Sequence, residues 1–347
     1  MKQPVSETPK LISRRTFLSL TGTLTLGVAS LGVPLPSEAV KFDRNLYKVS
    51  KSRIGMGTFI TIMAFHPSQG EAEDAIGRAF AEIYRLSDMM TRYESSSQVS
   101  HLNSTGTLNE VTPELMEVLR ASLHYHGISR RTFDITIKPV VDLYQESFRA
   151  NSGPPSSEAL KEVMERVGSH HLRITKTSVS FGRSGMEVTL DGIAKGYIVD
   201  RAMDLLRKQN IEHALINAGG DILVYGGKGE GKPWKIGIQD PCKRNGQVDV
   251  VTLKNGAIAT SGNYEVFFDQ EKLFHHLIRP NSGDPAPETA SVTIRAASCM
   301  EADAIATSVY VMGPARGSQF IGQLPSIEGL VISSQGKKMP SSGWKRM

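Results

Sequence analysis

The sequence predicts an α+β fold in which antiparallel strands pack against long helices. An alternating and then apolar stretch over residues 59–65 indicates a strand, and apolar residues at helical spacing over 71–93 indicate a long amphipathic helix. A second helix is predicted after Gly192. Further strand-like runs cover 188–190, 214–217, 222–225, 234–238, 250–260 and 291–297. This mixed order of elements is compatible with an α+β arrangement in which both helices bury their apolar faces on the sheets.

Composition places the chain among folded globular proteins. Its 347 residues, 39% hydrophobic and 22% charged, suffice for one large or two modest domains. The formal net charge is +5, and four basic against two acidic residues place +2 of it in the first 39 residues. The remaining +3 is too little to indicate nucleic-acid binding. Cys242 and Cys299 allow one disulfide without establishing it, and without nearby histidines they make a poor zinc site.

The first 39 residues have the features of an export signal. Arg14 and Arg15 form a twin-arginine pattern, and the apolar run over 18–33 is too short and too mild for a stable membrane anchor. Small residues at the end of this segment favour cleavage after Ala39, so we expect one mature domain over 40–347 in the periplasm. An uncleaved N-terminal helix is the alternative. Twin-arginine export carries folded proteins, which allows a cofactor to be bound before export.

Polar and turn-forming residues separate the remaining elements. A polar loop is expected over 91–103, a shorter helix over 113–126, and a final helix over 301–312. The run RANSGPPSS over 149–157 is the most linker-like segment of the mature chain.

Two glycine turns lie close together in the sequence from 188 to 227. The first, Asp191-Gly192, leads into a helix with Lys195 in its first turn, and the second, over 218–221, joins two strands. Main-chain N–H groups at a glycine turn, a helix N-terminus and a lysine together favour a phosphate site. Most strand-to-helix glycine turns bind nothing, and this stretch alone leaves both interpretations open.

The final helix contains a possible metal-binding pair. Asp303 and Thr307 are four residues apart, so their oxygens lie on the same side of the helix and suit a hard cation such as magnesium. On this pair alone the other interpretation is favoured, in which Asp303 caps the helix and Thr307 bonds its own backbone.

Eight ordered motifs resemble those of one family. They are MGT at Met56, LSDMMTRYESSSQVSHLN ending at Asn103, TFDIT at Thr132, LDGIAKGYIVD at Leu190, NAGGDI at Asn217, ATSGNYE at Ala259, HLIRPNSG at His276 and ADAIAT at Ala302. In this order they resemble the ApbE family of FAD:protein FMN transferases, and the resemblance covers essentially the whole mature chain.

The resemblance implies an ApbE-like, T-fold-related architecture with a flavin cleft between its two halves, lined by the two glycine turns. It implies magnesium-dependent transfer of FMN from FAD to a threonine hydroxyl of an acceptor flavoprotein, with release of AMP. Carried over by position, flavin and nucleotide contacts fall on Met56, Tyr93, Thr132, Phe133, Asp134, Lys195 and Ile278. Magnesium falls on the Gly192 carbonyl, Asp303 and Thr307, and His276 is the candidate general base.

The chain departs from the family pattern in several places. Thr189 stands where the family has aspartate, Asp191 where it has glycine, and Arg279 where it has aspartate. The family's SGDYER-like run reads SGNYEV here, over 261–266. The TLDGIAKG turn is closer to the NosX-type branch, which favours a NosR-type acceptor over a subunit of a sodium-pumping complex. Two other functions stay open: an FAD hydrolase giving FMN and AMP, and a non-enzymatic FAD-binding maturation factor of a respiratory reductase.

Overall fold

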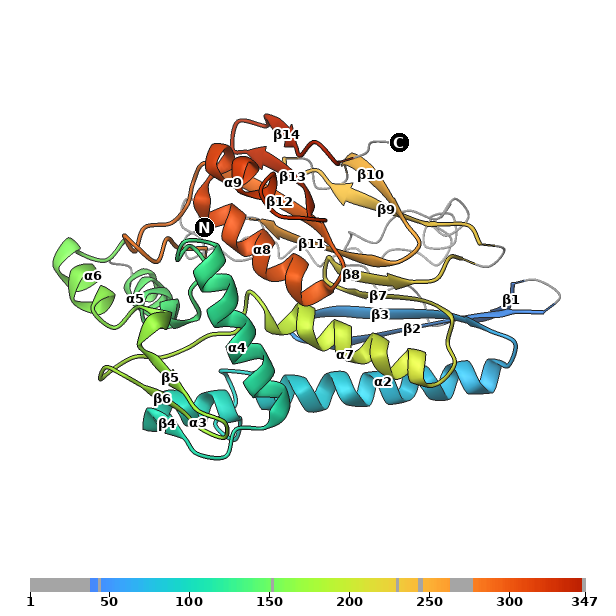
Figure 1. Ribbon diagram of the computed structural model, residues 1–347, viewed down its shortest axis with the longest axis horizontal. Coiled ribbons are helices and arrows are strands. Elements are labelled where there is room, and N and C mark those ends of the chain that lie inside the picture. The colour runs from blue at the N-terminus through green and yellow to red at the C-terminus, as the bar shows by residue number, and fades with distance from the viewer. Residues whose placement is uncertain are drawn as a thin grey trace, which may run out of the picture.

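The computed structural model describes residues 38–42, 45–150, 153–228, 231–242, 246–262 and 277–344. Its centre is a nine-stranded sheet, ordered β1-β2-β3-β7-β8-β11-β12-β13-β14, in which every neighbouring pair is antiparallel (Figure 1). The strands are β1 (Glu38–Lys41), β2 (Tyr47–Gly55), β3 (Thr58–His66), β7 (His213–Ala218), β8 (Asp221–Tyr225), β11 (Gly256–Gly262), β12 (Thr289–Ala296), β13 (Glu328–Ser333) and β14 (Lys338–Pro340).

Helices cover one face of this sheet. The described helices are α2 (Gln69–Met90), α3 (Gln98–Thr105), α4 (Pro113–Ile128), α5 (Lys138–Arg149), α6 (Ser157–Met164), α7 (Ala194–Lys208), α8 (Cys299–Met312) and α9 (Pro314–Ile321). α2 packs on β2 and β3, α7 on β7 and β8, and α8 on β11 and β12. The resulting main core includes Ile76, Phe80 and Tyr197.

The opposite face of the sheet is covered by a two-stranded sheet of β9 (Trp234–Gln239) and β10 (Gln247–Leu253) (Figure 1). Strand alternation explains the two cores, because successive side chains point to opposite faces. In β8, Leu223 joins the helix-side core, whereas Ile222 and Val224 pack with Trp234 on the other side.

A smaller region adjoins the N-terminal end of α7. It combines α3 to α6 with a three-stranded sheet of β4 (Thr107–Leu108), β5 (Leu172–Ile174) and β6 (Val179–Phe181), and with short 3-10 turns η1 (Ile135–Ile137) and η2 (Ser169–His171) (Figure 1). The linker-like run over 149–157 connects α5 to α6 here. None of the helices in the described part of the chain has the length and apolar character needed to cross a bilayer.

The predicted α+β fold, the long helix, the helix after Gly192 and their burial on the sheet are confirmed. The predicted strand over 188–190 is wrong, because its polar backbone groups bond elsewhere. The Asn103 side chain donates to the Val188 carbonyl and accepts from the Val188 N–H, and the Thr189 N–H donates to the Ile135 carbonyl.

Two further segments differ from expectation. The polar loop predicted to continue through Asn103 becomes α3, which Ser97 caps by accepting from the Ser100 N–H at 2.9 Å. The strand predicted over 250–260 is two strands in different sheets, β10 and β11, because a bend at Lys254-Asn255 separates them.

α7 and α8 approach each other unusually closely at Gly196. A Cβ at this position would lie 2.4 Å from the Cys299 carbonyl oxygen and 2.8 Å from the Met300 Cα. Both are backbone atoms, which cannot rotate away as a side chain can. Only glycine therefore lets the first turn of α8 rest directly on α7.

We predict that Gly196→Ala destabilises the protein by about 1–3 kcal/mol, because the added methyl group must push α7 and α8 apart. Gly77→Ala in α2 is the matched control, since nothing lies within 4 Å of its added methyl group. The control should gain about 0.5–1 kcal/mol from helix propensity. Thermal and urea unfolding of both variants measure the difference. A Gly196→Ala protein as stable as the wild type would show that this contact is not tight.

Candidate active site

The two glycine turns meet at the start of α7. Lys195 reaches across to Asp221, the first residue of β8, with 3.2 Å between Nζ and Oδ2. Asp221 is 2% exposed, so its charge is compensated inside the protein rather than by water. The register of Ile60 with Ala218 also brings the β2–β3 turn, which contains Met56, beside the second glycine turn. The expected proximity of the two turns is confirmed.

The backbone of the first glycine turn is less available than expected for a phosphate cradle. The N–H groups of Ile193 and Ala194 both donate to the Leu190 carbonyl, and the N–H of Gly196 donates to Asp303 at 3.2 Å. The predicted main-chain cradle is therefore wrong for these three amides. The positive charge at this turn comes instead from the half-buried Lys195 ammonium group.

The residues that contain the three predicted metal ligands lie close together. A Cβ on Gly192 would lie 2.9 Å from the Thr307 Oγ1, so the turn presses directly against that hydroxyl. The Thr307 Oγ1 also lies 3.3 Å from the Ser261 Oγ. Asp303 lies one turn earlier on α8, is 6% exposed, and accepts from α7 through its Oδ2. The N-cap of α8 is Ser298, so the capping alternative for Asp303 is wrong.

These residues suit magnesium by their chemistry. A carboxylate, a hydroxyl and a backbone carbonyl are all hard oxygen donors, and magnesium usually takes one or two carboxylates and completes its shell with water and phosphate oxygens. Within the described ranges, no three His, Cys, Asp or Glu side chains gather as a possible metal site. A carboxylate, a hydroxyl and a carbonyl are a donor set typical of a magnesium ion that completes its shell with water and phosphate oxygens.

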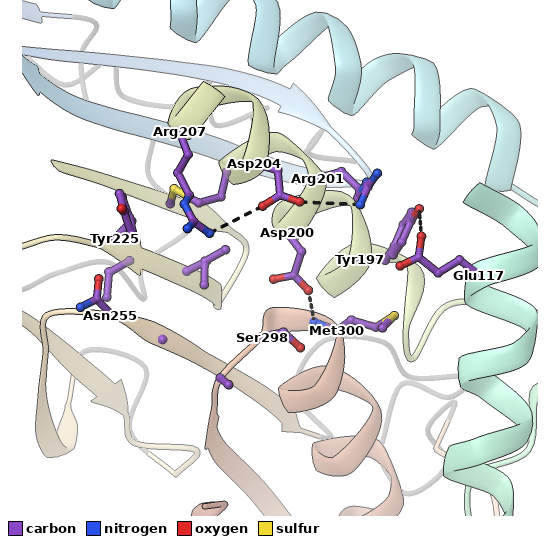
Figure 2. A pocket seen from close by; sticks show the side chains of 15 residues that line it. Glu117, Tyr197, Asp200, Arg201, Asp204, Arg207, Tyr225, Asn255, Ser298 and Met300 are labelled. Carbon is purple, nitrogen blue, oxygen red and sulfur yellow. Dashed lines mark hydrogen bonds and ion pairs between the residues drawn. The ribbon is translucent and has the colours of Figure 1, made fainter. Parts of the chain in front are cut away.

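Asp200 fixes the start of α8 from α7. Its carboxylate accepts from the Cys299 N–H at 2.7 Å and from the Met300 N–H at 2.9 Å, while Ser298 accepts from the Glu301 N–H at 3.2 Å. The first three amides of α8 are thus all satisfied, although helix N-termini lack intrahelical partners. Figure 2 shows Asp200 extending to Met300. Both residues line a cavity of about 420 Å³.

Burial, reinforced by neighbouring carboxylates, raises the pKa of Asp200. Burial has the largest effect and the two backbone N–H groups oppose it, while Asp204 and Glu301 add to it, so that the pKa rises from 3.8 to about 6. Burial, followed by Asp221, Asp200 and Asp303, likewise raises the pKa of the enclosed Cys299 thiol. Several carboxylates thus gather at the α7–α8 junction.

Phe133, in the TFD segment over 132–134, packs against the turn at Gly192. Phe133 is 3% exposed, and its Cε2 would lie 3.4 Å from a Cβ on Gly192. Thr132 is half-buried and donates to the Ser129 carbonyl at 2.9 Å. Phe133 therefore lies against the turn at Gly192, whereas the Thr132 hydroxyl bonds within its own segment.

Asp134 has a structural role in addition to the predicted one. Its carboxylate accepts from the backbone N–H and hydroxyl of Thr136, from the N–H and hydroxyl of Ser169, and lies 3.3 Å from the His126 Nδ1. Both oxygens are thus used within the protein. Flavin contact by this carboxylate stays a prediction.

The remaining predicted contacts are more dispersed. Met56 occupies the β2–β3 turn at a φ of 51°, and Tyr93 is 74% exposed just after α2. Ile278 is 3% exposed and packs on Val140 and Val141 of α5. His276, the predicted base, lies outside the described residues, so its role stays a prediction.

Sequence reasoning missed several residues that position this site: Asp200, Asp221, Ser261, Asn103 and Arg92. All five stand within recognised motifs, and Ser298 with Glu301 forms the serine-x-x-glutamate pattern of a capping box. That pattern was the readable signal for the start of α8. The pairings themselves join residues too far apart in the chain to be read from spacing.

The antiparallel α+β fold defines a protein in which helices cover one face of a sheet, with Asp303, Thr307 and Lys195 gathered where α7 meets α8. The chain belongs to the ApbE family, whose family model matches residues 56–331.

Its relatives and solved neighbours are consistent with this assignment. An FAD:protein FMN transferase of Vibrio cholerae is 31% identical over 270 residues, covering 75% of this chain and 80% of the relative. One of Klebsiella pneumoniae is 29% identical over 297 residues, covering 84% and 90%. The crystal structure of the ApbE protein of Thermotoga maritima aligns with a TM-score of 0.78 at 26% identity, over 85% of this chain and 97% of that one. The flavin transferase ApbE of Vibrio cholerae aligns with a TM-score of 0.72 at 29% identity, over 88% of this chain and 98% of that one.

We predict a specific pH dependence for Asp200→Asn. Since the folded pKa of Asp200 is raised, the folded protein binds a proton that the unfolded chain releases between pH 4 and 6. Wild-type stability relative to the neutral Asn variant should therefore fall, by on the order of 2–3 kcal/mol, as pH rises through this window, and stay level above it.

Urea unfolding of both proteins at several pH values from 4 to 8 measures this difference. Asp204→Asn, one turn further along α7 with an exposed side chain, controls for loss of a carboxylate from this helix. A difference that is independent of pH, or that grows in the opposite direction, would contradict the raised pKa.

Proposed function

We propose that this protein transfers FMN from FAD to a threonine hydroxyl of an acceptor flavoprotein and releases AMP. Membership of the ApbE family and relatives named FAD:protein FMN transferase support the transfer. The observation that carries it to this chain is the convergence of Gly192, Asp303 and Thr307 beside Lys195. A cation site next to a lysine is what a diphosphate substrate requires.

The chain's own residues act on the two phosphates in different ways. Lys195, oriented by the buried Asp221, offers its ammonium group to a phosphate oxygen. Asp303, Thr307 and the Gly192 carbonyl would hold magnesium, which would neutralise charge on the diphosphate when bound. Asp200 and Gly196 keep α8 against α7, so that these oxygens stay in register with the turn. The site is thereby pre-organised before substrate arrives.

The reaction balances as a phosphoryl substitution. The threonine oxygen bonds to the phosphorus on the FMN side, the bridging P–O bond of FAD breaks, and AMP leaves with the bridging oxygen. A threonine hydroxyl is a poor nucleophile unless a base takes its proton, and such help is typically worth about 10²- to 10⁴-fold. We assign this role to His276, whose neutral imidazole is available near neutral pH because its ordinary pKa is about 6.5.

The compartment and the acceptor are part of this proposal. The twin-arginine pattern at Arg14 and Arg15 supports export to the periplasm, and the TLDGIAKG turn supports a NosR-type acceptor. The hydrolase alternative differs only in that water replaces the threonine. The relatives named as transferases favour the threonine.

We predict that Asp303→Asn lowers turnover of FAD far more than it lowers FAD affinity. The amide keeps an acceptor for the Gly196 N–H but removes the negative charge that suits magnesium. The magnesium concentration needed for half-maximal turnover should rise at least about 10- to 100-fold. Thr307→Val, compared with Thr307→Ser, isolates the hydroxyl in the same assay. FAD turnover that persists in a chelator would count against a magnesium role.

We predict that His276→Ala abolishes FMN transfer while FAD still binds. The assay incubates enzyme, FAD and magnesium with a purified NosR-type acceptor domain and its threonine-to-alanine variant, and intact-protein mass spectrometry detects an added FMN. The adduct should form only with wild-type enzyme and threonine-bearing acceptor. An equal yield from His276→Ala would remove His276 from the mechanism. FAD cleavage to FMN and AMP without any adduct would favour the hydrolase.

A further inference from the structure

Five side chains of alternating charge form an ion-pair network beside the turn before α7. Arg92 donates to Asp191 at 3.1 Å and to Asp142 at 3.3 Å, and Lys138 donates to Asp142 and to Glu187, each at 2.5 Å. The two ends of this network lie on one segment, since Glu187 and Asp191 both precede α7. In between it passes through the end of α2 and through α5.

Arg92 is the most buried member of this network. Its side chain is 7% exposed, whereas that of Asp191 is 52% exposed. Burial opposes its charge, but Asp191, Tyr93 and Asp142 outweigh this effect and raise its pKa. A guanidinium group held between two carboxylates keeps its charge, and its planar fork contacts both at once.

The same guanidinium group lies over the ring of Tyr93, 4.6 Å from its centroid. A cation over an aromatic face is attracted by the ring, so this contact orients a side chain that is otherwise 74% exposed. An exposed tyrosine ring without such a partner would change rotamer freely. Arg92 therefore holds the Tyr93 ring in one place.

Arg92 also contacts the turn at Gly192, through its ion pair with Asp191. Asp191 directly precedes Gly192, and Gly192 presses on Thr307 and Phe133. One buried side chain therefore joins Tyr93, one of the predicted flavin and nucleotide contacts, to the predicted diphosphate turn. These two parts come from segments 99 residues apart, as the separation of Arg92 and Asp191 shows.

We propose that Arg92 is a positioning residue for flavin binding, which fixes the Tyr93 ring relative to the Gly192 turn through Asp191 and Asp142. This inference rests on the proposed function. It assigns Arg92 no contact with the reacting atoms. Its effect is to place the isoalloxazine end of FAD in register with the diphosphate, where a misplacement of about 1 Å can cost on the order of 10²-fold in rate.

Arg92→Lys tests the inference, because lysine keeps the charge but cannot bridge two carboxylates in a plane. Arg85→Lys is the matched control: it removes an arginine of α2 that also bridges two carboxylates, Glu82 and Glu114. FAD affinity is measured by quenching of flavin fluorescence, and AMP affinity by competition. We expect Arg92→Lys to weaken FAD binding about threefold or more. The affinity for AMP, which lacks the isoalloxazine ring, should change less than twofold.

A double-variant cycle with Tyr93→Leu identifies the route of the effect. Stacking on an aromatic side chain is typically worth about 1–3 kcal/mol, so Tyr93→Leu alone should weaken FAD binding by about 5- to 160-fold. If Arg92 acts through Tyr93, adding Arg92→Lys should cause little further loss. Asp191→Asn, a change at a half-exposed side chain, should weaken FAD in the same direction with an unchanged unfolding midpoint.

Three results would overturn the inference: Arg92→Lys that binds FAD like Arg85→Lys, equal weakening of FAD and AMP, or fully additive effects in the cycle. Each leaves the proposed function intact if wild-type protein still transfers FMN. Wild-type protein that neither binds FAD nor forms the FMN adduct would instead overturn the proposed function.

Discussion

The contact between α7 and α8 determines the geometry of the whole site. Each helix supplies a carboxylate to backbone amides of the other, since Asp200 binds the start of α8 and Asp303 binds Gly196 of α7. The missing side chain at Gly196 brings the two backbones together, and the reciprocal bonds fix their register. Thr307, Asp303 and Gly192 belong to one site only because this junction aligns them. Lys195 and Asp221 then add the sheet as a third fixed element.

Strong periodicity made the main elements predictable. α2 carries apolar residues at helical spacing, and β3 is nearly continuous and apolar, so both could be identified from local pattern. β2, with the sequence YKVSKSRIG, offers too few apolar residues for such a pattern, and it was not identified. Residues 188–190 look like a strand by composition, yet the Asn103 side chain satisfies the backbone of Val188. A bond formed across 85 residues has no local signature.

The site could be predicted as a set of motifs but not as a set of contacts. The motif positions of Gly192, Asp303 and Thr307 do converge, and Phe133 adjoins them. The ion pairs of Lys195 with Asp221 and of Arg92 with Asp191 and Asp142 were missed, because one sequence does not reveal which charges meet. The departure at Asp191 is the clearest case. It looked like a defect in a glycine turn, whereas the structure gives that carboxylate a buried arginine partner.

The placement of the two cysteines has a consequence for how the protein matures. Cys299 is fully enclosed at the α7–α8 junction and Cys242 is exposed, and neither forms a disulfide. Cys299 becomes inaccessible only when α8 docks, and its raised pKa further suppresses the reactive thiolate. A chain exported unfolded would present both thiols to the oxidising machinery of the periplasm. Under the twin-arginine route proposed above, docking precedes export, so the order of events itself would protect the thiol from mispairing.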